Sequence, residues 1–196
     1  MNLSKKAHLT DLRESIAQAA LTGNTAQHDI LLPLLECWKK QQSFRSFAPL
    51  LEDSSDRVVH FFVADAFAFA NDEKLLKPLM KAAVAPVNRN YSATYIWPCG
   101  KYDCTKHLSF FVNFMTKCVD PGEAMVACLE VFEAMNGPFK PNNLKANVRR
   151  LLMQSNPALE DSLEAQHELF RTQAAYTLLD KYYSQIDAEW RTNKLG

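Results

Sequence analysis

Apolar residues recur three or four positions apart along almost the whole of this 196-residue chain. That spacing is the period of an α-helix with one apolar face. No segment alternates apolar and polar residues between the turn signals that a β-hairpin needs. The run RVVHFFV, residues 57–63, has a strand-like composition, but it continues into ADAFAFA at helical spacing and is better read as helix. The sequence therefore predicts an all-α fold.

The apolar stripes mark a series of expected helices separated by short polar segments. We expect Gly23 to end the first helix in the C′ position, and the run DSSD, residues 53–56, is rich in residues that begin helices. The last helix is the longest, and the face formed by LLDKYYSQIDAEW, residues 178–190, is expected to cap the C-terminal end of the fold. The stripes comprise Leu9, Leu12, Ile16 and Ala19; Leu31, Leu34, Leu35 and Trp38; Val59, Phe62, Val63, Ala66 and Phe69; Leu75, Leu76, Leu79 and Met80; the runs 107–115 and 124–135; Leu144, Val148, Leu151 and Leu152; and Leu159, Leu163, Leu169, Tyr176, Leu179 and Tyr183.

Charge and composition disfavour several classes of protein. Lys and Arg total 22 and so do Asp and Glu, so the basic excess of a typical nucleic-acid-binding protein is missing. The N-terminal residues lack the apolar core of a signal peptide, and no window approaches about 18 uninterrupted apolar residues, so we expect no membrane span. Five cysteines without the spacing of a disulfide scaffold suit a reducing compartment. A cytoplasmic protein is expected.

Similar helix pairs recur along the chain. Residues 47–70 and 75–97 each begin with a short helix that contains a proline, and Pro78 follows Pro49 by 29 positions. Residues 107–135 repeat the helix–turn–helix pattern without the proline. A period of about 30 residues lies within the range of stacked helical repeats. Because an interior proline costs a helix about 3 kcal/mol, its recurrence indicates a kink that the fold accommodates.

Three segments carry a resemblance to a known family. APLLEDSSDRVVHFFVADAFA, residues 48–68, resembles a HEAT-type repeat, with proline and leucines in the first helix, an Asp-containing turn, and Arg57 and Val58 opening the second helix. GKYDCTKHLSFFVNFM, residues 100–115, and AMVACLEVFEAM, residues 124–135, resemble segments of small bacterial HEAT-like proteins. Some of those proteins are similar to immunity proteins of polymorphic and contact-dependent toxin systems.

The resemblance implies a particular architecture. It covers residues 44–153 and implies an α-solenoid of antiparallel helix pairs of the HEAT or ARM kind. The whole chain, 1–196, would then form one all-α domain. Residues 1–43 and 154–196 align with no repeat and are expected to be capping helices, since terminal repeats are usually atypical.

The stretch TYIWPCGKYDCTKH, residues 94–107, holds the residue types most typical of a chemical site. Cys99, Cys104 and His107 could be read as metal ligands or as a thiol with its base. Structural zinc usually takes four ligands from paired short motifs, and no second short-spaced pair is present. A thiol enzyme needs a base, an orienting group and an oxyanion site that converge in a cleft, and this spacing is too local to form one. We therefore interpret the stretch as a joint between two helical repeats.

Other polar residues of interest are interpreted as helix caps. Asp103 or Thr105 is expected to cap the helix that follows the joint. The carboxylate pairs in LEDSSD, NDEK and LEDSLE stand at expected helix starts, where acidic groups complement the helix dipole. The chain has no Gly-rich phosphate loop, HExxH or GxSxG motif. The sequence thus assigns no catalytic, cofactor-binding or metal-binding residue and predicts that the protein is not an enzyme.

Candidates for contact with a partner come from two groups of residues. Aromatic residues crowd the segment 91–102 beside an arginine, and Tyr, Trp and Arg are enriched at binding hot spots. The alternative is that Tyr95 and Trp97 pack between neighbouring repeats. Acidic residues at helix starts could complement a basic active site on a partner. The candidates are Asp53, Asp56, Asp72, Glu73, Arg89, Tyr91, Tyr95, Trp97, Lys101 and Tyr102.

The resemblance implies an immunity-type protein that binds a cognate bacterial toxin, a nuclease being the favoured kind, and neutralises it by occluding its active site. One alternative is a HEAT-like nucleic-acid-binding protein or DNA glycosylase, for which Lys145, Arg149 and Arg150 form the only local basic cluster. Another is a generic protein-binding scaffold. The sequence leaves the oligomeric state open.

Overall fold

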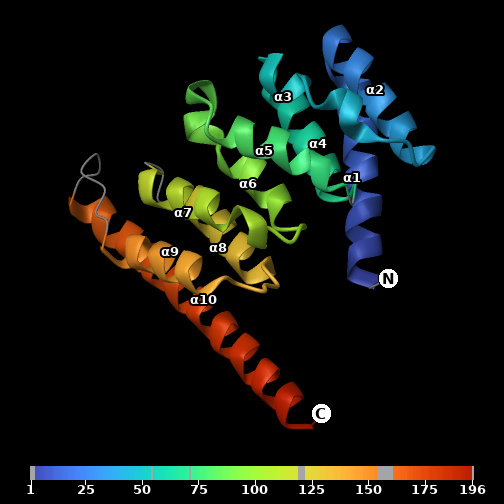
Figure 1. Cartoon of the computed structure of the whole chain (residues 1–196). Helices are drawn as coiled ribbons and strands as arrows, with labels where there is room; N and C mark the ends of the chain where they lie inside the picture. The colour runs from blue at the N-terminus through green and yellow to red at the C-terminus, as the bar shows by residue number, and fades with distance from the viewer. Residues whose placement is uncertain (1–2, 54, 71, 119–121, 154–160, 196) are drawn as a thin grey trace. The chain divides into compact units, whose positions relative to one another are not determined.

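The computed structural model describes residues 3–195 except 54, 71, 119–121 and 154–160 (Figure 1). The side chains of 3–10, 53, 161–162 and 193–195 also fall outside this description. Every regular element in the described part of the chain is helical, which confirms the predicted all-α class. No helix among these residues combines the length and apolarity needed to cross a membrane.

The helices gather into two compact units, Met1–Ala82 and Ala83–Gly196. The first contains α1 (Leu3–Thr22), α2 (Thr25–Lys39), the 3-10 helix η1 (Phe44–Phe47), α3 (Leu50–Asp53), α4 (Arg57–Ala68), η2 (Glu73–Leu75) and α5 (Leu76–Ala83), whose last residue lies at the boundary. The second contains η3 (Pro86–Tyr91), α6 (Ala93–Cys99), η4 (Thr105–His107), α7 (Leu108–Lys117), α8 (Glu123–Ala134), α9 (Pro141–Met153) and α10 (Asp161–Leu195). The segment 44–153, expected to hold the repeats, therefore includes parts of both units.

In the first unit, α2 packs against both α1 and α4. The turn between α1 and α2 follows from local chemistry. Gly23 comes directly after the last residue of α1, at the C-cap and not at the predicted C′ position, and its backbone is not left-handed. A Cβ at this position would clash with Oε1 of Gln27 and lie 2.7 Å from the carbonyl oxygen of Ala19. Asn24 begins α2 with a capping box, because its side chain accepts the N–H of Gln27 while the Gln27 side chain accepts the N–H of Asn24.

In the second unit, alternate helices along the chain pack side by side. The helices α6, α8 and α10 contact one another in that order, and α7 contacts α9. Figure 1 shows α7 and α9 next to each other, with α10 running along α9 and extending past it toward the C-terminus. The interior of this unit is aromatic and aliphatic, and its largest fully buried side chains are Tyr95, Phe111, Phe132, Ile96 and Leu108.

The joint between α6 and α7 is held by polar contacts to the α8–α9 connection. The carboxylate of Asp103 accepts hydrogen bonds from the backbone N–H and hydroxyl of Thr105, at 3.1 and 2.5 Å, and from the N–H of Asn136 at 3.2 Å. The Thr105 hydroxyl oxygen in turn accepts the N–H of Gly137 at 3.0 Å. The N-cap residues of η4 and α7 are Cys104 and His107, so neither Asp103 nor Thr105 takes the predicted cap position. The Asp103 carboxylate instead binds the first N–H of η4 and fixes a loop about 30 residues further along the chain.

The long helix α10 packs differently from what its apolar stripe indicated. The residues it buries are His167, Arg171, Ala174, Ala175 and Leu178. Four large members of the predicted stripe are exposed, namely Leu163, Leu169, Tyr176 and Tyr183, and Leu159 lies outside the described residues. The helix thus approaches α8 and α9 through small and polar side chains and presents aromatic ones to solvent.

Candidate functional site

The stretch 94–107 forms a packed joint. Cys99 and Cys104 are fully buried, and their Sγ atoms donate to the backbone oxygens of Tyr95 and Cys99, at 3.3 and 3.4 Å. Burial raises the pKa of the Cys99 thiol well above its ordinary value, which opposes formation of the nucleophilic thiolate. In the part of the chain that the structure describes, no group of three or more His, Cys, Asp or Glu side chains is placed to hold a metal ion.

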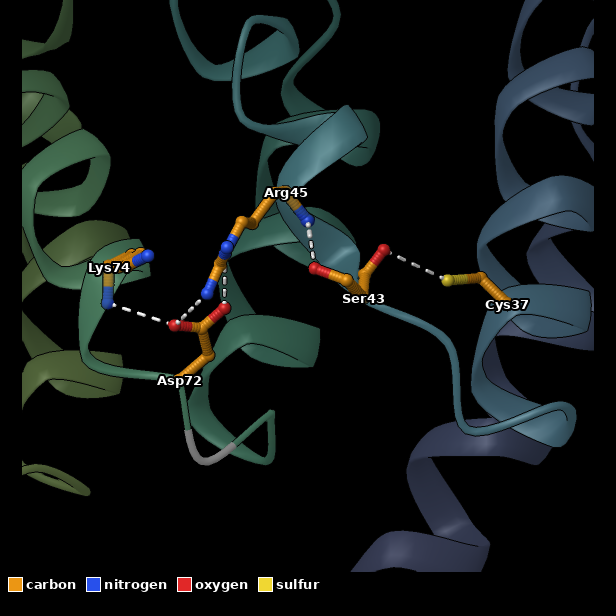
Figure 2. Close-up of polar contacts among 5 residues, drawn as sticks. All are labelled: Cys37, Ser43, Arg45, Asp72 and Lys74. Atoms are coloured by element: carbon orange, nitrogen blue, oxygen red, sulfur yellow. Dashed lines mark hydrogen bonds and ion pairs between the residues drawn. The ribbon is translucent and has the colours of Figure 1, made fainter.

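The acidic candidates of the first unit make internal contacts. The Asp72 carboxylate forms a two-point ion pair with Arg45, at 2.6 and 3.0 Å, and accepts the N–H of Lys74 at the start of η2 (Figure 2). The hydrogen bond from Arg45 lowers the pKa of Asp72. The segment that holds Ser43 and Arg45 is in turn tied to α2. The Arg45 backbone N–H donates to the Ser43 hydroxyl, and the Cys37 thiol of α2 donates to the Ser43 carbonyl (Figure 2).

Asp56 is likewise engaged. Its carboxylate accepts the N–H groups of Val58 and Val59 at the start of α4 and the side-chain N–H of Gln27. Burial alone would raise the pKa of Asp56, but these hydrogen bonds outweigh it and the pKa is lowered. Glu73 is exposed, and the Asp53 side chain lies outside the described residues. Asp56 and Asp72 thus help to shape the first unit, and their charges are already compensated in part.

The aromatic candidates of the second unit divide into core and surface residues. Tyr95 and Tyr102 are buried, so we assign them to packing and not to direct contact with a partner. This is the alternative that the sequence left open for Tyr95. Trp97 is half-buried, whereas Arg89, Tyr91 and Lys101 are exposed.

A pocket of about 420 Å³ opens beside Arg89 on the second unit. One wall is formed by the segment that leads into η3 and α6, and the other is formed by α7. Most of its surface is apolar, and Val84 at its edge is largely exposed. The lining residues are Ala83, Val84, Ala85, Pro86, Arg89, Ser92, Phe110, Asn113, Phe114, Lys117 and Cys118.

Local hydrogen bonds fix the walls of this pocket. The buried Ser92 hydroxyl lies 2.9 Å from the carbonyl oxygen of Ala83, to which it donates, and this bond ties together the two ends of the segment 83–92 in the second unit. On the other wall, the Asn113 side-chain oxygen accepts a hydrogen bond from Arg150 of α9. The side chains of Ser92 and Asn113 thus tie the two walls of the pocket to neighbouring parts of the second unit.

The charged groups of the pocket are both cationic. Arg89 lies on η3 and Lys117 is the last residue of α7, and both are exposed. An apolar cleft of this volume with a few polar groups has the general properties of a ligand or side-chain binding site. Its cations would favour an anionic group at the rim. None of the lining residues is an Asp, Glu or His.

Sequence reasoning identified Arg89 but missed the rest of the pocket. Phe110, Asn113, Phe114 and Lys117 recur at helical spacing on one face of α7, which was the available signal. That face was interpreted only as a core stripe. Its closeness to Arg89 in space does not show in the sequence, because the two segments are far apart along the chain.

Comparison with known proteins found no matching family model, no matching curated protein and no matching solved structure. The fold and the pocket thus define an all-helical protein with an apolar, cation-flanked surface cleft.

Proposed function

We propose that this protein is a non-enzymatic binding protein that holds part of one protein partner in the cleft beside α7. The observation that carries this proposal is the cleft itself, which offers a mostly apolar volume of about 420 Å³ lined in part by the exposed residues Arg89 and Lys117. Tyr91 is exposed on the same short helix as Arg89. Tyr and Arg are the residue types most enriched at the hot spots of protein interfaces.

The chemistry of the cleft also indicates which part of a partner it would hold. An apolar side chain of the partner would pack against the apolar walls of the cleft, and carboxylates beside it would pair with the two cations. Asp72 is paired with Arg45 and Asp56 accepts local N–H groups, so these acidic residues have less charge to offer a basic surface. We therefore favour an acidic and apolar segment of the partner over the basic active site of a nuclease as the point of contact.

The specific form of the proposal is an immunity-type protein that neutralises a cognate bacterial toxin in the cytoplasm. This rests on the resemblance of residues 44–153 to HEAT-like repeats. The order of contacts in the second unit, with α6 next to α8 and α8 next to α10, is the order expected when helix pairs stack, and it supports an α-solenoid for that unit.

The proposal is tested in cells that express the toxin-like product of an adjacent gene. Co-expression of this chain should restore growth, and the purified pair should form a stable complex. The double variant Arg89→Glu/Lys117→Glu should weaken binding about tenfold or more, whereas Lys106→Glu, an exposed cation outside the cleft, should have little effect. If cells that co-express this chain stay as sensitive to the toxin as cells without it, the immunity role is contradicted. Equal binding by both variants would contradict the role of the cleft.

A nucleic-acid-binding role is the second candidate, and α9 provides the observation that favours it. Lys145 and Arg149 are exposed on this helix, which contains no acidic residue, while Arg150 is half-buried and bonded to Asn113. Two exposed surface cations give a small electrostatic footprint. Salt-sensitive binding to duplex DNA that is lost in Lys145→Glu/Arg149→Glu would support this role, and no binding at low salt would remove it.

A further inference from the structure

Large apolar side chains form an exposed stripe along α10. Leu169, Tyr176, Tyr183 and Trp190 are spaced seven residues apart, and their exposed fractions are 65, 68, 66 and 56%. The opposite face of the helix is the one that packs against the second unit. Monomeric proteins rarely expose apolar patches above a few hundred Å² unless the patch has a binding role. This stripe is therefore a candidate interface.

The spacing of the stripe is that of a coiled-coil seam. A repeat of seven residues corresponds to 3.5 residues per turn, which keeps a seam facing a partner helix along a left-handed supercoil. Between the four stripe residues, Thr172, Leu179 and Ile186 occupy the intervening heptad positions. Each of these three is at least partly accessible. Together, the seven residues make a seam that extends over six turns of one helix.

We infer that α10 pairs with α10 of a second copy of this chain, in the antiparallel orientation. The side chains of the seam expose about 500 Å² per copy, since a buried aromatic residue covers about 150–250 Å². Two copies would then bury about 1,000 Å² in total, which reaches the lower limit for a specific protein interface. A heptad seam also requires a second heptad seam as its partner, and α10 of another copy supplies one.

The sizes of the side chains decide the orientation. In a parallel pair each residue meets its own copy, so Trp190 would face Trp190 and Thr172 would face Thr172. The layers would then alternate between overfilled and underfilled, which conflicts with the uniform packing density of protein interiors. In the antiparallel pair centred on Lys181, Trp190 lies opposite Thr172. The other layers pair Tyr183 with Leu179 and Tyr176 with Ile186, and Leu169 lies beyond the last of these layers.

The dimer is tested by sedimentation and by light scattering on the full chain over a wide concentration range. The unmodified chain should change from monomer to dimer as its concentration rises. Tyr183→Glu should weaken the dimer at least about 100-fold, because two copies of the charge enter the seam. Ala188→Glu is the matched control, since it adds the same charge to an exposed position on another face of α10 and should leave the dimer intact. A chain that stays monomeric throughout, or an equal response of both variants, would overturn the inference.

The orientation is tested with single cysteine substitutions at two exposed aspartates, which occupy the same heptad position one repeat apart. In the antiparallel pair, Asp180 lies beside its own copy near the two-fold axis, so Asp180→Cys should form a disulfide-linked dimer under mild oxidation. Asp187 lies about 18 Å along the helix axis from its copy, so Asp187→Cys should not. Asp180→Asn should also tighten the dimer, because it removes a like-charge pair at the centre. Equal cross-linking at both positions would overturn the antiparallel arrangement.

Discussion

The most informative perturbation of the fold is the loss of Glu164, which pairs with a buried arginine. Arg171 is 3% exposed and projects from the face of α10 that packs against the rest of the second unit. Its Nη2 atom donates to Oε1 of Glu164 at 2.5 Å and its Nη1 atom reaches the carbonyl oxygen of Leu151 at 3.4 Å. Among the described residues, its Nε atom has no hydrogen-bond partner. Glu164 is therefore its main anionic partner.

The expected magnitude follows from the cost of an uncompensated buried charge. Breaking a buried ion pair from one side usually destabilises a protein by 3–5 kcal/mol, roughly, because the remaining charge stays out of water. The Glu164 side chain is 23% exposed, so water can reach the gap that Glu164→Ala leaves. We therefore expect a loss of about 3 kcal/mol in the free energy of unfolding. Replacing both partners, as in Glu164→Ala/Arg171→Met, should recover part of that loss.

The assay is urea unfolding followed by circular dichroism, together with hydrogen exchange at the amides of α9 and α10. Glu168→Ala is the control, since this residue lies on the same helix but is exposed, and it should change stability by less than about 0.5 kcal/mol. The reasoning would be refuted by a Glu164→Ala loss below about 1 kcal/mol. It would also be refuted if the double variant were less stable than the single one.

Three further predictions concern buried or bonded polar groups. Burial and the neighbouring Arg171 charge lower the pKa of His167 below 6.5, so the imidazole binds a proton less readily in the folded state than in the unfolded state. The stability of the fold should therefore fall as the pH drops below about 6.5. In a pH series of thermal melts, His167→Gln should reduce that fall. Asp103→Ala should cost about 1–2 kcal/mol in urea unfolding, because its three donors lose their acceptor; an unchanged midpoint would contradict this. Cys99 and Cys128 are fully buried, and burial raises the pKa of both thiols, so a thiol reagent should modify them only as fast as the chain unfolds; rapid labelling in the native state would be inconsistent with this.

Local features of the fold could be predicted because they depend on residues close together in the chain. The end of α1 before Gly23 follows from the need for a small residue where the chain turns. The start of α4 follows from Asp56, whose side chain reaches N–H groups two and three residues away. The assignment of RVVHFFV to a helix rested on periodicity and is confirmed by the bounds of α4.

The candidate site could be predicted only in part. Arg89 was identified from its residue type and its aromatic neighbours, and the structure places it at the cleft. Lys117 and Phe110 were missed because they join Arg89 only after α7 packs beside the segment that contains η3. Tyr95 was identified by residue type as well, yet it is buried, since composition does not show which side of a short helix faces the core.

The long helix shows most clearly where the sequence stops being informative. Periodicity alone predicted a long helix with an apolar stripe over residues 158–190, because both properties are set within a few turns, and the structure has α10 over Asp161–Leu195. Tertiary structure decided that Ala174 and Ala175 pack inward while Tyr176 and Tyr183 stay exposed. The physical reason is that α10 comes close to neighbouring helices at Ala174 and Ala175, where only small side chains fit, while His167, Arg171 and Leu178 fill the rest of the contact face. Which face of the helix meets a neighbour depends on distant parts of the chain. The apolar pattern therefore predicts the helix but not which of its faces is buried.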